Sequence, residues 1–278
     1  MKQKKSLILR GVGFLLIILL PALAFANVED RVGVDKDALM KKVSGLQMPF
    51  IENQGQIKDK SVRFYANTFA GTVFITDKGE IVYSLIKTEN RQKNSKLQTT
   101  RLSSSKSPDS KLQTQDTITK AIALRESLEC PEETGITGVN KSVTRVNYFI
   151  GSKDNWRTDI PAWQEVSLGK VYKGVELKLR AYGNNVEKLF TVYPEGSVED
   201  IKLKMEGAKG LKVNEDGELE IETKLGTVKM TKPVAYQEIN GKRVQVAANY
   251  SLTKSEIKNQ KSSTVFRLEN TTEQNPLS

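Results

Sequence analysis

The sequence predicts an all-β protein, an antiparallel β-sandwich-like assembly of about a dozen short strands with little helix. Three observations predict this fold class. Short segments rich in Val, Ile, Phe, Tyr and Thr recur at a spacing of about 8–12 residues. Gly, Asn and Asp separate them at positions typical of turns. Helical periodicity is clear only over residues 35–46, where Asp35 can cap the helix and Gly45 can end it.

The strands follow one another from residue 61 onward. Residues 61–69, 71–76 and 80–86 alternate apolar and polar side chains, and Ala70-Gly71 and Asp77-Lys78-Gly79 separate them, so they predict a three-stranded meander. Asn240-Gly241 is the strongest hairpin signal, because both residues tolerate the positive φ of a type I′ turn. Further strands are predicted at 120–128, 144–150, 163–168, 175–182, 186–193, 201–205, 211–213, 218–223, 227–231, 234–239, 243–252 and 264–268.

One segment interrupts this pattern. Residues 88–117 are almost entirely Ser, Thr, Gln, Asn, Lys and Arg, with Leu97, Leu102 and Leu112 as the only apolar side chains. Such a segment cannot bury enough apolar surface to offset the entropy lost on ordering. The sequence therefore predicts a disordered insertion at 88–117.

Two strands carry opposite charges on one face. Lys202 and Lys204 alternate with Ile201, Leu203 and Met205, while Glu218, Glu220 and Glu222 alternate with Leu219 and Ile221. If these strands are neighbours, lysines and glutamates meet on the solvated face and the apolar residues face the core. The alternative is that the three glutamates form a metal or acid–base site, but alternating acids are far more often a solvated face.

The N-terminus has the three zones of an export signal. A basic stretch at 1–10 precedes an apolar run at 11–20, and Ala24 and Ala26 fit a peptidase that accepts A-x-A. The predicted organisation is a cleaved leader at 1–26, an N-terminal segment with the short helix at 27–48, an all-β domain at 49–268 and a polar tail at 269–278. Retention of the leader as an anchor is the alternative, although its uncharged stretch is shorter than the ~20 residues that span hydrocarbon. We expect a secreted, periplasmic or extracellular protein with no membrane span after cleavage.

Composition excludes several chemistries. The chain has 278 residues, no His and a single Cys, so Ser-His-Asp and Cys-His catalysis, His-ligated metals and internal disulfides are all excluded. Removing the four leader cations from 43 Lys and Arg leaves 39 against 33 acids, mixed in sign along the chain. Nucleic-acid binding needs clustered positive charge, so we expect none. Cys130 has no adjacent basic side chain and is interpreted as an incidental thiol.

No catalytic constellation emerges from the remaining residues. Carboxylates are plentiful, but no spacing singles out two that face one cleft, as acid–base catalysis without His would require. Trp156 and Trp163 flank a stretch read as a loop, and an indole there could stack on a sugar ring. The favoured interpretation is that both rings pin this loop to the core.

Three ordered blocks resemble a known family. They are Phe50-Ile51-Glu52-Asn53-Gln54-Gly55-Gln56 with 62–65, then 146–151 with Trp156-Arg157-Thr158, 160–161 and 171–175, and finally Pro233-Val234-Ala235-Tyr236-Gln237 with Asn240-Gly241. Over roughly residues 45–252 the series resembles the uncharacterised N-terminal domain that precedes SBBP β-propeller-type repeats in large secreted bacterial proteins. The resemblance implies an exported, all-β module without assigned catalysis or cofactor. The insertion at 88–117 and the absence of propeller repeats before Ser278 depart from the pattern.

The functional expectation is a non-catalytic surface or extracellular module for scaffolding or recognition, without cofactor or metal. Its partner would be a surface protein, a propeller-repeat protein or a glycan. The alternative is a protein that binds or cleaves polysaccharide through the Trp156–Trp163 segment. Hydrogen bonding in turns is the favoured role for the polar residues of the matching blocks. The candidate site residues are Glu52, Asn53, Gln56, Asn147, Trp156, Arg157, Trp163 and Gln237.

Overall fold

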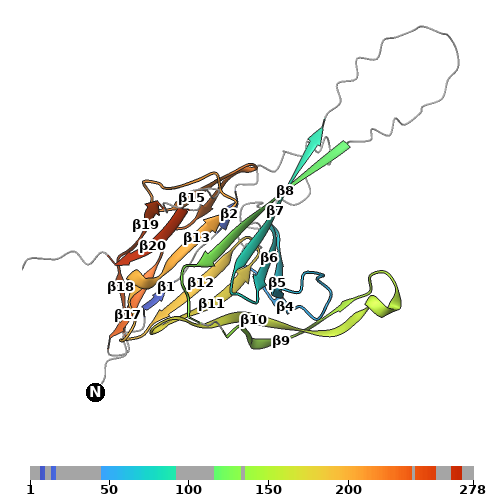
Figure 1. Cartoon of the computed structure of the whole chain (residues 1–278), viewed down its shortest axis with the longest axis horizontal. Helices are drawn as coiled ribbons and strands as arrows, with labels where there is room; N and C mark the ends of the chain where they lie inside the picture. Colours follow the sequence, from blue (N-terminus) through green and yellow to red (C-terminus); the bar gives the residue numbers. More distant parts are fainter. Residues whose placement is uncertain are drawn as a thin grey trace, which may run out of the picture.

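The computed structural model describes residues 7–9, 14–16, 45–91, 116–132, 135–239, 242–254 and 264–270. Within these residues the chain is built of antiparallel strands and two short 3₁₀ turns, η1 (Lys153–Asn155) and η2 (Val198–Asp200) (Figure 1). The predicted all-β fold class is therefore confirmed. The helix predicted at 35–46 lies outside the described residues apart from Gly45 and Leu46. The tail predicted at 269–278 also lies outside them, apart from Glu269 and Asn270, which end β20.

The described strands form three sheets. The largest has 14 strands in the order β1-β12-β11-β10-β4-β5-β6-β7-β8-β13-β20-β19, with β3 paired to β11 and β9 to β10. A smaller sheet has the order β14-β15-β16-β2, and β17 pairs with β18. The bounds in the large sheet are β1 Leu7–Leu9, β3 Gln47–Met48, β4 Phe50–Glu52, β5 Val62–Thr68, β6 Gly71–Thr76, β7 Ile81–Arg91, β8 Asp116–Leu128, β9 Thr137–Tyr148, β10 Arg157–Tyr172, β11 Val175–Tyr182, β12 Val186–Val192, β13 Lys202–Glu206, β19 Ala248–Lys254 and β20 Thr264–Asn270. The others are β2 Phe14–Leu16, β14 Gly210–Val213, β15 Leu219–Thr223, β16 Gly226–Met230, β17 Ala235–Ile239 and β18 Lys242–Val246.

The large sheet folds over on itself around one core. Lys188 of β12 contacts Glu126 of β8, although these strands are far apart in the order of the sheet. The main buried cluster combines side chains of β5–β8, of β10–β13 and of the small sheet β15–β16. Alternation produces this arrangement, because every second residue of β11 faces inward: Val175, Leu177, Leu179 and Ala181.

The predicted meander is confirmed. Val62–Thr68, Gly71–Thr76 and Ile81–Arg91 pair in sequence as β5, β6 and β7. β7 continues to Arg91 and pairs there with Asp116 of β8. The prediction of a disordered insertion was therefore wrong at its two ends, 88–91 and 116–117, where the backbone continues an established ladder. Residues 92–115 lie outside the described part.

Other boundaries differ from the sequence prediction. β10 has 16 residues instead of the six predicted at 163–168, and the segment 243–252 is divided into β18 and β19 at Ala247. The strands β3 and β4 were not predicted. β17 and β18 pair with Ile239 opposite Lys242, as the hairpin prediction requires, while Asn240 and Gly241 themselves lie outside the described residues.

Two described strands fall inside the predicted leader. β1 pairs with β12, and β2 pairs with β16, so each lies along an edge of a strand of the following domain. The sequence interpretation gave residues 1–26 no place in the fold. Leader cleavage remains a prediction.

The glutamates of β15 face lysines, but not those expected. β13 pairs with β8 and β20 and is not a neighbour of β15, so the condition for Lys202 and Lys204 to meet the glutamates is not fulfilled. β15 instead lies between β14 and β16. Its Glu220 carboxylate is 2.9 Å from Lys212 Nζ and 3.3 Å from Lys229 Nζ, and Glu218 is 3.1 Å from Lys229 Nζ. The apolar residues of β13 and β15 are buried as predicted.

This ion-pair cluster predicts a pH dependence. The hydrogen bond from Lys212 lowers the pKa of Glu220 to about 2, and Asn214 and Lys229 lower the pKa of Glu218. A pKa lower in the folded than in the unfolded state stabilises the fold above the unfolded value, and the contribution is lost as the pH falls towards the folded value. We expect Glu220→Gln to lose less stability than the wild type between about pH 5 and pH 2. Urea unfolding across this range measures the difference, and parallel pH curves would contradict the prediction.

Candidate functional site

The β9–β10 hairpin projects from the body of the molecule, with η1 at its tip (Figure 1). The tip is a compact turn, because the Asn155 and Trp156 amides donate to the Ser152 and Lys153 carbonyl oxygens at 2.9 and 3.1 Å. Gly151 enters it at φ +70°, where a side chain would be strained. The turn therefore holds the residues on either side of it, from Phe149 to Trp156, in one arrangement.

Three large apolar side chains are exposed at this tip. Phe149 is 59% exposed, Ile150 69% and Trp156 40%. The Phe149 and Trp156 rings meet edge to face, with centroids 5.1 Å apart and planes at 81°. Neighbouring exposed aromatic side chains of this kind are typical of interaction sites. We call Phe149, Ile150 and Trp156 the hairpin tip cluster.

Arg157 fixes the base of this tip. Its Nη1 donates to the Asp154 and Trp156 carbonyl oxygens at 2.9 and 2.8 Å, and its Nε donates to the Gln54 carbonyl oxygen at 3.1 Å. Gly55 permits this approach, since a Cβ there would lie 3.4 Å from Arg157 Nε on a backbone with φ +100°. The structure thus brings together the first two blocks that the sequence singled out.

Asn53 organises the loop that receives Arg157. Its Nδ2 donates to the carbonyl oxygens of Val62, Ile57 and Asp59 at 2.9, 3.2 and 3.3 Å. Its Oδ1 accepts from the Gly55 and Ile57 amides, both at 3.1 Å. These contacts are with the backbone of the same loop, so the side chain is used in holding the loop.

Glu52, Gln56 and Trp163 continue the network towards the core. Gln56 Nε2 donates to the Glu52 carbonyl oxygen at 2.6 Å, and Trp163 Nε1 donates to Glu52 Oε2 at 3.4 Å. Trp163 packs against the main core, and a Cβ on Gly138 would lie 2.2 Å from its ring. Trp163 is thus part of the hairpin's packing, whereas Trp156 is exposed. The segment between them is the start of strand β10, so reading it as a loop was wrong.

Of the last two predicted residues, Asn147 lies in the same hairpin and Gln237 lies apart. Asn147 Oδ1 accepts from the Asp159 amide at 2.8 Å and holds Asp159 at φ +57° beside the β9–β10 ladder. Gln237 is partly buried in β17, in the separate two-stranded sheet opposite Val244. The residues that sequence reasoning missed at the tip are Phe149 and Ile150. Their signal was the run of apolar residues just before the turn Gly151-Ser152.

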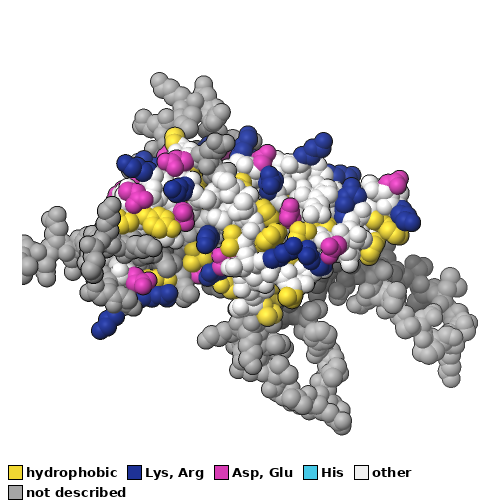
Figure 2. All heavy atoms as spheres, turned by 90° about the horizontal axis from the view of Figure 1, so that it is seen from below, with side chains coloured by type: hydrophobic (Ala, Val, Ile, Leu, Met, Phe, Trp, Pro, Cys, Tyr) yellow, Lys and Arg dark blue, Asp and Glu magenta, His cyan; other side chains and the backbone are white. Residues whose placement is uncertain are grey.

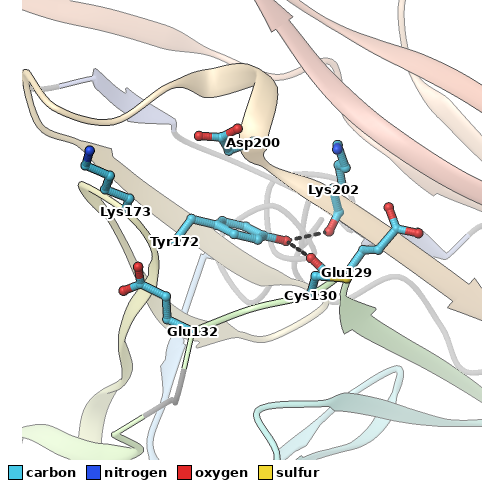
Figure 3. A pocket seen from close by; sticks show the side chains of 7 residues that line it. All are labelled: Glu129, Cys130, Glu132, Tyr172, Lys173, Asp200 and Lys202. Atoms are coloured by element: carbon cyan, nitrogen blue, oxygen red, sulfur yellow. Dashed lines mark hydrogen bonds between the residues drawn. The ribbon is translucent and has the colours of Figure 1, made fainter.

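A surface cavity of about 310 Å³ lies elsewhere, between β10 and the start of β13 (Figure 3). Tyr172 lies at its centre, with its hydroxyl 3.0 and 2.9 Å from the Glu129 and Lys202 carbonyl oxygens, and burial raises its pKa to about 12. Cys130 is exposed at the rim. The remaining lining mixes both signs of charge and offers no charge preference: Glu129, Glu132, Lys173, Asp200 and Lys202.

The rest of the described surface does not point to a particular class of ligand. Lys, Arg, Asp and Glu side chains are interspersed on the face in Figure 2 and do not gather by sign. Among the described residues no group of three or more Cys, Asp or Glu side chains could hold a metal ion. In the same part of the chain no helix has the length and hydropathy to cross a bilayer.

A family model matches residues 50–278, beginning at the first residue of β4 and including both blocks that meet at the hairpin base. The chain belongs to the DUF7948 family. This family is described as a domain of unknown function. Searches of the curated proteins and of the solved structures returned no match to the chain. The DUF7948 match confirms an uncharacterised domain family over most of the sequence, and it includes every candidate residue named above.

Proposed function

We propose that the DUF7948 chain is an exported, non-catalytic recognition module that presents the hairpin tip cluster to a partner protein at the cell surface or outside the cell. The observation that carries the proposal is the exposure of Phe149, Ile150 and Trp156 at the end of a projecting hairpin. Aromatic side chains supply much of the binding energy of protein interfaces because they bury large areas with few rotatable bonds.

The contacts at the base of the tip support a binding role. Arg157 and the loop around Asn53 hold the turn through backbone carbonyl oxygens, so little entropy remains to be lost when a partner binds. The Phe149–Trp156 ring contact stabilises the turn, but it does not account for the exposure of Ile150 and of the outer ring faces. Of the polar residues predicted from sequence, Asn53 and Arg157 would thus act as positioning residues for the tip.

Export is the second part of the proposal and rests on the leader at 1–26 and on the resemblance to domains that precede SBBP repeats. The partner of the exported chain would be a propeller-repeat protein or another surface protein. Removing the leader would also remove β1 and β2, which leaves β12 and β16 with free backbone edges. Such edges can pair with an added strand.

Carbohydrate binding is the second candidate, and the exposed indole of Trp156 favours it. Sugar rings stack on open aromatic faces, but they also need polar groups that hydrogen-bond their hydroxyls. At the tip Arg157 already donates to three backbone oxygens, and Asp159 lies 3.6 Å from Arg145. These groups are engaged, which favours a protein partner over a glycan.

Retention on isolated cell envelopes tests the proposal. We expect Trp156→Ser and Phe149→Ser each to weaken retention about tenfold or more, because truncated hot-spot aromatics cost at least about 2 kcal/mol. Phe69→Ser is the matched control, since Phe69 is 55% exposed at the β5–β6 turn. Circular dichroism verifies that all variants are folded.

Pretreatment of the envelopes separates the two candidates. Proteolysis of the envelopes should abolish retention if the partner is a protein, whereas periodate oxidation should abolish it if the partner is a glycan. Equal retention of the tip variants and the wild type would overturn both the protein-binding and the glycan-binding proposals.

A further inference from the structure

The core contains an ion pair that neither the fold nor the proposed function explains. Lys188 Nζ lies 2.6 Å from Glu126 Oε2, and both side chains are 0% exposed. Tyr83, also buried, donates its hydroxyl to the same Glu126 oxygen at 3.1 Å and lies 3.5 Å from Lys188 Nζ. The three groups come from β12, β8 and β7 and meet inside the folded sheet.

Strand alternation places the lysine there. Val186, Lys188, Phe190 and Val192 share the inward face of β12, so Lys188 occupies a position that otherwise carries an apolar side chain. Glu126 has the same orientation in β8 as Leu124, which is fully buried. Both charges are therefore held in the core by the register of their strands, and neither side chain reaches solvent.

Keeping this pair ionised is costly. Desolvation of two buried charges can exceed their mutual attraction unless hydrogen bonds satisfy every atom. Glu126 Oε1 is buried and has no hydrogen-bond partner among the described residues. Burial lowers the pKa of Lys188 against the opposing pull of Glu126. One proton transfer along the 2.6 Å contact would convert the pair into a neutral amine and a carboxylic acid.

We propose that Lys188 and Glu126 condense into an intramolecular amide, a covalent cross-link between β12 and β8. A bond forms between Lys188 Nζ and Glu126 Cδ, and the bond from Cδ to Oε2 breaks. Oε2 leaves with two protons as one water molecule, because the ammonium and carboxylate together contain the atoms of an amide and a water. Neither electrons nor a co-reactant are required.

The geometry of the site fits this reaction. Nζ contacts one oxygen of the carboxyl group at 2.6 Å, so it has to move only from this oxygen to the adjacent Cδ for the bond to form. Tyr83 donates to the leaving oxygen, and burial raises the pKa of its hydroxyl so that it stays protonated. Glu126 Oε1 would become the amide carbonyl oxygen, and a neutral carbonyl without a partner costs less than a carboxylate oxygen. The product removes both charges from the core.

The intact mass of the purified wild-type chain in denaturant tests the proposal. We expect a mass one water lower than the mass calculated for the purified chain from its own N-terminal residue, and a proteolytic peptide in which the segments around Lys188 and Glu126 are joined. Lys188→Arg should have the full sequence mass, since it has no amine to acylate. Lys204→Arg is the matched control, because Lys204 and Glu206 form a 2.8 Å pair on the surface and should not condense.

Two further measurements make the result specific. Cyclisation at Asp216-Gly217 would also remove one water, but Asp216→Glu and the peptide map distinguish it from the cross-link. The Tyr83→Phe variant should be isolated largely without the cross-link. Its cross-link should form at least about a hundredfold more slowly than that of the wild type, which is the usual effect of losing a proton-transfer group. A wild-type chain of full sequence mass, with the two peptides recovered separately, would overturn the proposal whatever the variants do.

Discussion

Replacing Lys188 by Met is expected to lower the free energy of unfolding by about 3–5 kcal/mol, because it leaves Glu126 as a buried carboxyl group without its partner, whether an ion pair or the proposed amide joins the two in the wild type. Glu126 would keep its place in the core, but its Oε2 would lose the contact with Nζ, while Oε1 already has no partner among the described residues. Tyr83 would remain as one hydrogen-bond donor to the carboxylate. A single neutral donor does not replace an ammonium group.

Urea unfolding of three variants measures this effect. Lys204→Met removes a surface partner of Glu206 and should cost no more than about 1 kcal/mol. The double variant Lys188→Met with Glu126→Leu removes both charges and should recover most of the loss. Any shortfall that remains against the wild type reports the contribution of the proposed cross-link. A loss below about 1 kcal/mol in Lys188→Met would show that the site is not dry.

Gly71→Ala is expected to destabilise the fold by about 3–5 kcal/mol, combining backbone strain with overpacking. Gly71 has φ +138°, and a Cβ there would lie 2.0 Å from the Ser84 carbonyl oxygen. Thr72 pairs with Ser84 in the β6–β7 ladder, so the clash is with a backbone that cannot move without breaking that ladder. The substitution should therefore destabilise the pairing of β6 with β7 at the start of β6.

Gly226→Ala separates the two causes. Gly226 has φ +121°, but a Cβ there would meet nothing within 4 Å among the described residues. Only the conformational cost remains, so we expect a loss of about 1–3 kcal/mol. Thermal unfolding of both variants gives the comparison. Equal losses would mean that β7 yields to the added methyl group and that the close approach is not rigid.

The local sequence pattern was enough to predict most strands. It was not enough to predict which strands pair with one another. β11 was predicted with its observed limits, because alternation and the turn Gly183-Asn184-Asn185 define it within the segment. β13 and β15 were predicted with approximately correct limits, and their buried residues were correct, but the sequence left open whether they are neighbours, and they are not. Charge complementarity is the same for any lysine-bearing strand, so it cannot select β14 and β16 over β13.

The candidate site was predictable in its residues but not in their roles. The sequence singled out Asn53, Arg157 and Trp156 as candidate site residues, and the structure places them on the two sides of the hairpin base. It could not show that Trp156 is exposed and Trp163 packed, since both lie in similar polar surroundings. Lys188 was not predicted from the sequence. It lies two residues from Val186 and from Phe190 in the same strand, and this spacing indicates a side chain that points inward.

The length of β10 has a mechanical consequence. This strand has 16 residues, about 50 Å of chain if fully extended, and it is interrupted by irregularities at Asp159 and Gly169, where φ is positive. Its first part pairs with β9 beneath the tip, and its last part pairs with β11 inside the body. A partner that pulls on Trp156 would therefore load the same strand that forms the β10–β11 ladder, and the hydrogen bonds of that ladder would resist the pull. A force on the exposed tip would thus be transmitted along β10 to the part of the strand that packs in the core.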